Sequence, residues 1–143
     1  MFKALLVLVG LVLLVAPHLP PIEAPVIDPF RPPDSPYGPG NRGIEYDTQP
    51  GQVVLASADG VVSFSGSIGS SQYVSIRHSQ RLRTTYSFLA SRLVVRGQRV
   101  HQGDSIGVAG QRFHFGALRD DIYIDPASLF GELVTEVRLV GPP

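Results

Sequence analysis

From residue 43 onward, apolar and polar residues alternate in short runs that glycine-bearing turns separate. Alternation with a period of two, rich in Val, Ile, Phe, Tyr and Thr, is typical of β-strands that bury one face. The pattern predicts strands over 43–48, 53–55, 59–67, 72–78, 82–90, 93–96, 104–109, 112–118 and 121–124. We therefore expect a nearly all-β domain.

The segments between and after these runs have the residue types of turns and caps. Turn chemistry marks three of them: 58–60, 69–71 and 100–104. Over 125–130, Asp125 followed by Pro126 predicts one helical turn, because aspartate caps helix starts and proline suits the first helical position. A last alternating run predicts a final strand over 132–140.

The chain begins with a single cation, Lys3, followed by an uncharged apolar run over residues 4–16. This is the pattern of a secretory signal, and the run is shorter than the ~20 residues of a membrane-spanning helix. We expect residues 1–16 to be a signal peptide or an N-terminal membrane anchor. Cleavage stays open, because Pro17 follows the run and no Ala-x-Ala site lies downstream. The alternative is an ordinary buried helix, which the proline and the terminal position disfavour.

The remaining chain divides by composition. Prolines recur over residues 17–40 and favour extended backbone, which predicts a Pro-rich linker. The strand pattern then predicts one β domain over 41–130, followed by a C-terminal tail over 131–143 that contains the final strand. A length of 143 residues suits a single small domain.

Charge and cysteine content exclude several functions. Twelve basic and twelve acidic residues give a formal charge of zero, so no electrostatic surface for nucleic acid is expected. The sequence contains no cysteine, which excludes disulfides, thiolate metal sites, cysteine nucleophiles and a lipid-modified cysteine.

Seven segments follow one another in a characteristic order. They are 40–45 (GNRGIE), 50–54 (PGQVV), 58–66 (ADGVVSFSG), 73–78 (YVSIRH), 85–89 (TYSFL), 95–107 (VRGQRVHQGDSIG) and 112–116 (RFHFG). Together they resemble the lysostaphin/LytM-type zinc metallopeptidases, which cleave peptidoglycan peptides. The resemblance spans roughly residues 29–130. It implies a compact antiparallel β-sheet or sandwich of the duplicated-hybrid-motif type.

The resemblance also locates a metal site. In the family a histidine, an aspartate and a second histidine hold zinc, and these positions here are Asn41, Glu45 and His114. Two further family histidines orient water and the transition state, and their positions hold Phe88 and Arg112. A phenyl ring cannot carry a proton and arginine stays charged, so we expect no catalytic residue there. Asn41 offers only a neutral amide oxygen and Glu45 a carboxylate one methylene further out, so we expect no zinc at the other three positions.

Arg112 changes the electrostatics of this region. It is two residues from His114 on a predicted strand, so the two side chains share a face. At ~5 Å and an effective dielectric of ~20, a fixed charge opposes a metal by roughly 3 kcal/mol per unit charge product. We expect Arg112 to pair with Glu45 and to close the former metal site. The resemblance further implies a binding groove lined by Tyr86, Arg112 and Phe115.

Other polar residues fit structural roles. A turn, a short strand and a cap are expected at Asp120, Asp121 and Asp125. We interpret six arginines as a solvated face, with contact to an acidic wall polymer or phospholipid as the alternative: Arg77, Arg81, Arg83, Arg92, Arg96 and Arg99. His78 is expected to be structural or exposed, and His101 to be solvated.

Two functions of different classes follow from these expectations. The first is an exported cell-envelope module without catalysis or cofactor, which binds peptidoglycan or regulates a wall hydrolase and meets the membrane only through its N-terminal segment. The resemblance supports it, because family members without the zinc set act as amidase activators. The alternative is an active zinc endopeptidase with an atypical ligand set that includes Glu45 and His114. A biotinyl or lipoyl carrier, suggested by 97–107, is excluded because Lys3 is the only lysine.

Overall fold

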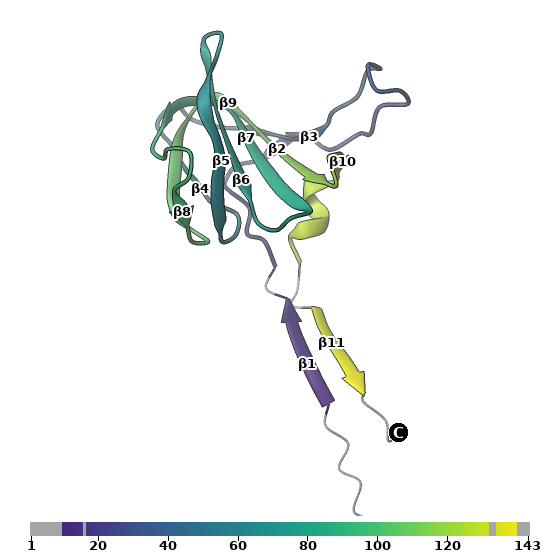
Figure 1. The fold of residues 1–143 in the computed structure, drawn as a ribbon. Coiled ribbons are helices and arrows are strands. Elements are labelled where there is room, and N and C mark those ends of the chain that lie inside the picture. Colours follow the sequence, from purple (N-terminus) through teal and green to yellow (C-terminus); the bar gives the residue numbers. More distant parts are fainter. Residues whose placement is uncertain (1–9, 16, 132–133, 140–143) are drawn as a thin grey trace, which may run out of the picture.

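Antiparallel β-strands build nearly the whole domain. The computed structural model describes residues 10–15, 17–131 and 134–139. The main sheet contains β2 (Val26–Asp28), β3 (Gly43–Asp47), β4 (Val53–Leu55), β5 (Gly60–Ile68), β6 (Ser71–Arg77), β7 (Leu82–Arg92), β8 (Arg99–Val100), β9 (Ser105–Arg119) and β10 (Ile122–Ile124). Its order is β2-β3-β9-β7-β6-β5-β8, with β4 and β10 also paired to β9 (Figure 1). The prediction of an all-β, antiparallel fold is confirmed.

The long strand β9 organises the sheet. One of its edges pairs with β7, and the other pairs first with β4 and then with β3. Residues 104–109 and 112–118, expected as two strands, are therefore one continuous strand. Gly110 lies between the two expected strands; its carbonyl accepts a hydrogen bond from the Thr48 hydroxyl, and the strand continues through it.

Alternation along β9 separates the core from the site. Phe113 and Phe115 are fully buried and pack against Tyr86 of β7, with ring centroids 6.3 and 5.3 Å away. Burial of such side chains contributes roughly 1.5–3 kcal/mol each. Arg112 and His114 alternate with them, so they project from the opposite face of the strand.

Several boundaries differ from the prediction. Residues 93–96 are not a strand, because only Val94 is buried there and the segment has no ladder partner. The short strands β2 and β8 were missed, since three and two residues are too few to show a period. The hairpin turn at Gly69 and the loop before β9 lie where they were expected.

The C-terminal end of the domain is a single 3-10 turn, η1 (Pro126–Leu129). The Asp125 side chain accepts a hydrogen bond from the Ala127 amide and Pro126 opens the turn, as predicted. Beyond it, β11 (Val134–Leu139) pairs antiparallel with β1 (Gly10–Val15) in a separate two-stranded sheet (Figure 1). Of the expected signal or anchor segment, residues 1–9 and 16 lie outside the described residues.

In the part of the chain that the structure describes, we find no helix with the length and apolarity needed to cross a membrane.

Candidate functional site

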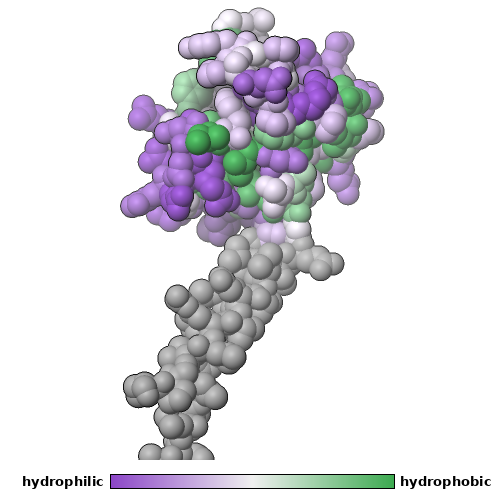
Figure 2. Space-filling model, turned by 90° about the vertical axis from the view of Figure 1, so that its right-hand side faces the viewer, coloured by the Kyte–Doolittle hydropathy of each residue, from purple (hydrophilic) through white to green (hydrophobic). Residues whose placement is uncertain are grey.

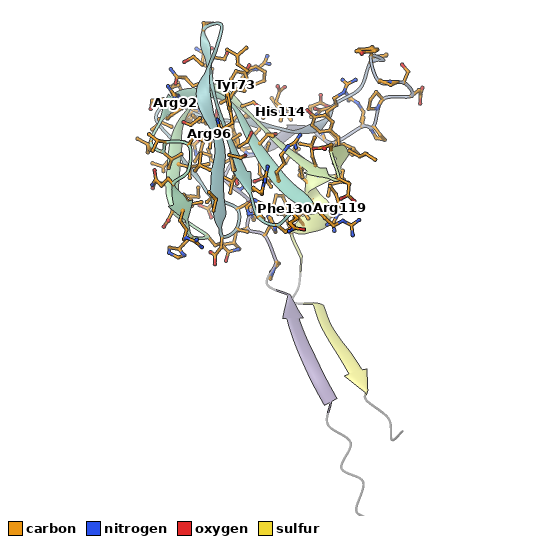
Figure 3. The ribbon with its side chains drawn as sticks, in the orientation of Figure 1. Tyr73, Arg92, Arg96, His114, Arg119 and Phe130 are labelled. Atoms are coloured by element: carbon orange, nitrogen blue, oxygen red, sulfur yellow. The ribbon has the colours of Figure 1, made fainter. Side chains whose placement is uncertain are left out.

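Three neighbouring strands bring the five family site positions together. Glu45 on β3 lies directly opposite His114 on β9, which lies opposite Ser87 on β7. Phe88 follows Ser87, and Asn41 lies two residues before β3. The predicted positions therefore form one site, in the half of the domain away from β1 and β11, where Figure 3 labels His114 and Tyr73.

Asn41 is the most constrained member of the site. Its side chain is buried, and its amide nitrogen donates to the carbonyl oxygens of Asp28 and Pro29, both at 3.0 Å. This orients the amide oxygen toward the Gly43 amide, at 3.3 Å, and toward Nε2 of His114, at 3.0 Å. An amide oxygen can only accept, so Nε2 of His114 must carry a proton and donate it.

The protonation state of His114 follows from its surroundings. Burial lowers the pKa of His114, and the attraction of Glu45 only partly opposes this effect. The ring is therefore neutral at pH 7, with its single proton on Nε2 in the hydrogen bond to Asn41. In this arrangement the Nε2 lone pair is not available to a metal ion.

Arg112 lies over the remaining positions. Its Nε atom is 3.6 Å from Oε1 of Glu45, so the expected ion pair forms. Its guanidinium carbon is 4.1 Å from the centroid of the Phe88 ring, which is cation–π geometry. The Arg112 side chain remains 57% exposed, whereas that of Glu45 is 24% exposed.

Phe88 has an unusual backbone conformation. Its φ of 63° lies in the left-handed region, where an aromatic residue is strained, and it sits at a register shift between Ser87 and Leu89. Such strain costs of order 1–3 kcal/mol and persists where the surroundings over-determine it. The bulge turns the ring toward Arg112 and toward His114, whose ring centroid is 6.3 Å away.

Two expected groove residues have a different role. Tyr86 and Phe115 are fully buried, so they belong to the core and do not line a groove. Phe115 follows His114 on the same strand, so the strand period itself places it on the face opposite Arg112. The side of the sheet on which Tyr86 lies depends on the register of β7. Of the three residues expected to line the groove, only Arg112 is exposed.

A buried polar network was not foreseen from the sequence. The Tyr86 hydroxyl donates to Oγ of Ser57 at 3.0 Å and receives a hydrogen bond from Thr84 at 3.0 Å. His78 joins through Thr84, at 2.8 Å, and His18 joins through Ser57, at 3.0 Å. His78 is thus structural, and it holds the start of the linker against the domain. Burial lowers the pKa of both histidines, that of His18 to about 4.

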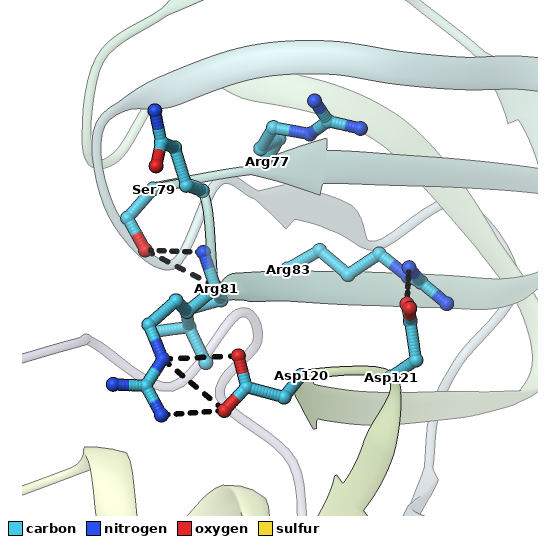
Figure 4. A pocket seen from close by; sticks show the side chains of 8 residues that line it. Arg77, Ser79, Arg81, Arg83, Asp120 and Asp121 are labelled. Carbon is cyan, nitrogen blue, oxygen red and sulfur yellow. Dashed lines mark hydrogen bonds and ion pairs between the residues drawn. The ribbon is translucent and has the colours of Figure 1, made fainter.

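Two of the six arginines, Arg81 and Arg83, form ion pairs with aspartates. Arg81 binds Asp120 through two nitrogens, and Arg83 binds Asp121, around a surface hollow that Arg77 also lines (Figure 4). Both aspartates have positive φ values in the turn between β9 and β10. This confirms a structural role for both aspartates, with Asp121 in the turn and not in the predicted strand over 121–124.

In this structure the three expected zinc-ligand positions are bonded to other groups of the chain. Zinc sites in this kind of protein need three nitrogen or oxygen donors with free lone pairs and one open position. Here the Asn41 oxygen already accepts two hydrogen bonds, Nε2 of His114 is a donor, and Glu45 faces a guanidinium. Within the described ranges, no three His, Cys, Asp or Glu side chains are grouped to hold a metal.

The fold and the order of the site segments define the class, a peptidoglycan-peptidase-like β domain. Residues 39–126 match peptidase family M23, and the chain belongs to this family. The peptidoglycan DD-endopeptidase ShyC of Vibrio cholerae is 36% identical over 109 residues, which cover 71% of this chain and 25% of that protein. The chain thus spans about a quarter of the length of this relative.

Solved structures agree on the fold. A zinc-containing peptidase from Vibrio cholerae superimposes with a TM-score of 0.72 at 24% identity, covering 85% of this chain and 41% of that one. The SpoIIQ–SpoIIIAH pore-forming complex contains a chain with a TM-score of 0.72 at 20% identity, covering 82% of this chain and 93% of that one. The resemblance inferred from the seven sequence segments is therefore confirmed at the level of family and fold.

Proposed function

We propose that this chain is an exported, non-hydrolysing M23 module that binds peptidoglycan in the cell envelope. The observation that carries the proposal is the bonding of the family ligand positions to one another. Asn41 is hydrogen-bonded to His114, and Glu45 is paired with Arg112. Metal binding through Nε2 of His114 and the Glu45 carboxylate would have to break both of these contacts.

The energetics support a closed site. To bind zinc through Nε2, His114 would have to carry its proton on Nδ1 instead and give up its hydrogen bond to Asn41, whose oxygen would keep only the Gly43 amide. Arg112 would also have to leave Glu45, because a divalent cation and a guanidinium repel each other at this range. Phe88 and Arg112 then offer no group that takes a proton from water at neutral pH.

The setting in the envelope rests on two observations. The apolar run after Lys3 has the pattern of an export signal, and the family relative ShyC is a peptidoglycan endopeptidase. The structural neighbour SpoIIQ–SpoIIIAH is a complex of two proteins, so docking onto a second envelope protein is compatible with this fold. We propose peptidoglycan as the partner of this chain. A wall hydrolase that the chain regulates is the alternative partner.

The proposal is tested by metal content, wall hydrolysis and wall binding. The purified full chain is exposed to zinc, dialysed and analysed by mass spectrometry, and it is incubated with labelled peptidoglycan. We expect no tightly held zinc, no chelator-sensitive release of fragments, and co-sedimentation of the chain with intact wall.

The control is a variant that restores the family set, with Asn41→His, Glu45→Asp, Phe88→His and Arg112→His combined. This variant is expected to hold one zinc per chain. One zinc held by the unmodified chain, together with fragment release, would overturn the proposal in favour of an active zinc endopeptidase. Failure of the chain to sediment with the wall would remove the binding function.

A further inference from the structure

The site exposes a cation on an aromatic base. The Arg112 guanidinium lies 4.1 Å from the Phe88 ring centroid while 57% of the Arg112 side chain stays accessible. Among the residues that the structure describes, neither Nη nitrogen of Arg112 has a hydrogen-bond partner. One edge of the guanidinium is thus open to solvent, with its donors in a planar fork.

The aromatic base is held in place before any ligand arrives. Phe88 sits on the left-handed bulge of β7, with the Tyr73 ring 5.9 Å away on one side and the His114 ring 6.3 Å away on another. These neighbours restrict the ring, and the ring restricts the arginine stacked on it. A guanidinium ordered in this way loses little entropy when it binds a ligand.

Glu45 shows which chemistry suits this guanidinium. Its carboxylate lies near the Nε atom, at 3.6 Å, which is longer than a direct charge-assisted hydrogen bond of about 2.7–2.9 Å. The pair therefore holds Arg112 in position without satisfying it. A second carboxylate approaching the Nη edge can form two parallel hydrogen bonds, the geometry that arginine prefers.

We propose that Arg112, stacked on Phe88, binds a free carboxylate of a peptidoglycan stem peptide. The proposal rests on the peptidoglycan-binding function above and names the chemical group that the site recognises. Arg112 supplies the guanidinium N–H donors, and the Phe88 ring fixes the plane of the guanidinium. Glu45 competes weakly with the ligand carboxylate for the guanidinium.

The experiment compares two forms of one synthetic stem pentapeptide, one with free carboxyl groups and one with all carboxyl groups as amides. Binding to the full chain is measured by calorimetry or by NMR titration at low salt. We expect the free acid to bind at least about tenfold more tightly, which is the effect of one charge-assisted interaction. Moderate salt should reduce this difference.

Variants assign the effect to the fork. Arg112→Gln is expected to abolish the preference for the acid, and Arg112→Lys to keep only part of it, because lysine is a point charge without a planar fork. Glu45→Gln is expected to tighten binding of the acid, because it removes the internal competitor. The matched control is Arg99→Gln, which removes an exposed arginine from β8 at the far edge of the sheet and should leave the preference unchanged.

The outcomes separate the two proposals. If both peptides bind equally and Arg112→Gln changes neither, carboxylate recognition is overturned while peptide binding stands. If neither peptide binds but the chain still sediments with intact wall, stem-peptide recognition is overturned and wall binding remains. If the chain neither binds peptide nor sediments, both proposals fail.

Discussion

At the scale of single residues, Asn41 has the largest consequence for the site. We expect this position to correspond to a zinc-binding histidine of the family, and here its amide joins the carbonyls of residues 28 and 29 to the Gly43 amide and to His114. Every polar atom of its side chain has a partner. This residue has therefore become part of the structure that orders the site.

Asn41→Ala is expected to destabilise the domain by about 1–3 kcal/mol, because the groups it leaves behind lose partners in a buried place. The measurement is the free energy of unfolding in urea. Asp34→Ala, an exposed change in the preceding loop, serves as the control and should have little effect. Equal stability of the two variants would contradict the structural role of Asn41.

At the scale of elements, the approach of β3 to β9 positions the site. Gly43 lies opposite Gly116, and a Cβ atom at position 43 would collide with the Phe115 carbonyl and lie 2.6 Å from Cε1 of His114. The backbones can approach at this point because Gly43 has no side chain. The glycine of the NRGIE segment is thus required by strand packing.

Gly43→Ala should consequently lower stability by about 1–3 kcal/mol or more, since the clash is with backbone that cannot move away cheaply. Thermal unfolding of the full chain measures the change. Gly131→Ala is the control, because nothing lies within 4 Å of a Cβ at that position. A melting temperature for Gly43→Ala that matches the control would mean that the strands separate more easily than their register implies.

At the scale of the whole molecule, polar contacts between distant segments hold the linker on the domain. His18 contacts His78, with ring centroids 4.7 Å apart, and Nδ1 of His18 is hydrogen-bonded to Oγ of Ser57 at 3.0 Å. Figure 3 places Arg119 and Phe130 in the half of the domain toward the two-stranded sheet. The positive charge of Arg119 helps to lower the pKa of His18. The face in Figure 2 combines large hydrophilic areas with smaller apolar ones.

This network predicts a pH dependence. Burial lowers the pKa of His18 to about 4 from 6.5 and also lowers that of His78, so the folded protein favours both neutral rings. Between these values the unfolded chain binds more protons, and stability falls as pH falls from about 6.5 toward 4. Urea midpoints between pH 7.5 and 4.5 measure the effect.

The double variant His18→Gln, His78→Gln should show a shallower pH dependence over this range than the unmodified chain. Gln80→Ala, a change at an exposed, uncharged residue between β6 and β7, provides the control and should leave the slope as it is. An unchanged slope in the double variant would assign the pH dependence to other groups.

The local pattern of the sequence was enough to predict most strands, the cap at Asp125 and the shared face of Arg112 and His114. These features depend on neighbours within a few residues, where the strand period and capping chemistry act directly. The order of the seven segments was enough to predict the family. The expected pairing of Arg112 with Glu45 is also present in the structure.

Only the tertiary structure decided what the remaining residues do. The burial of Tyr86, the continuity of β9 and the pairing of β2 and β8 depend on strands that are distant in the chain. The bonds from Asn41 to residues 28 and 29 likewise join a loop to a short edge strand. Strand register and long-range hydrogen bonds depend on packing contacts between segments that are distant in the chain. A local pattern of residue types therefore cannot predict them.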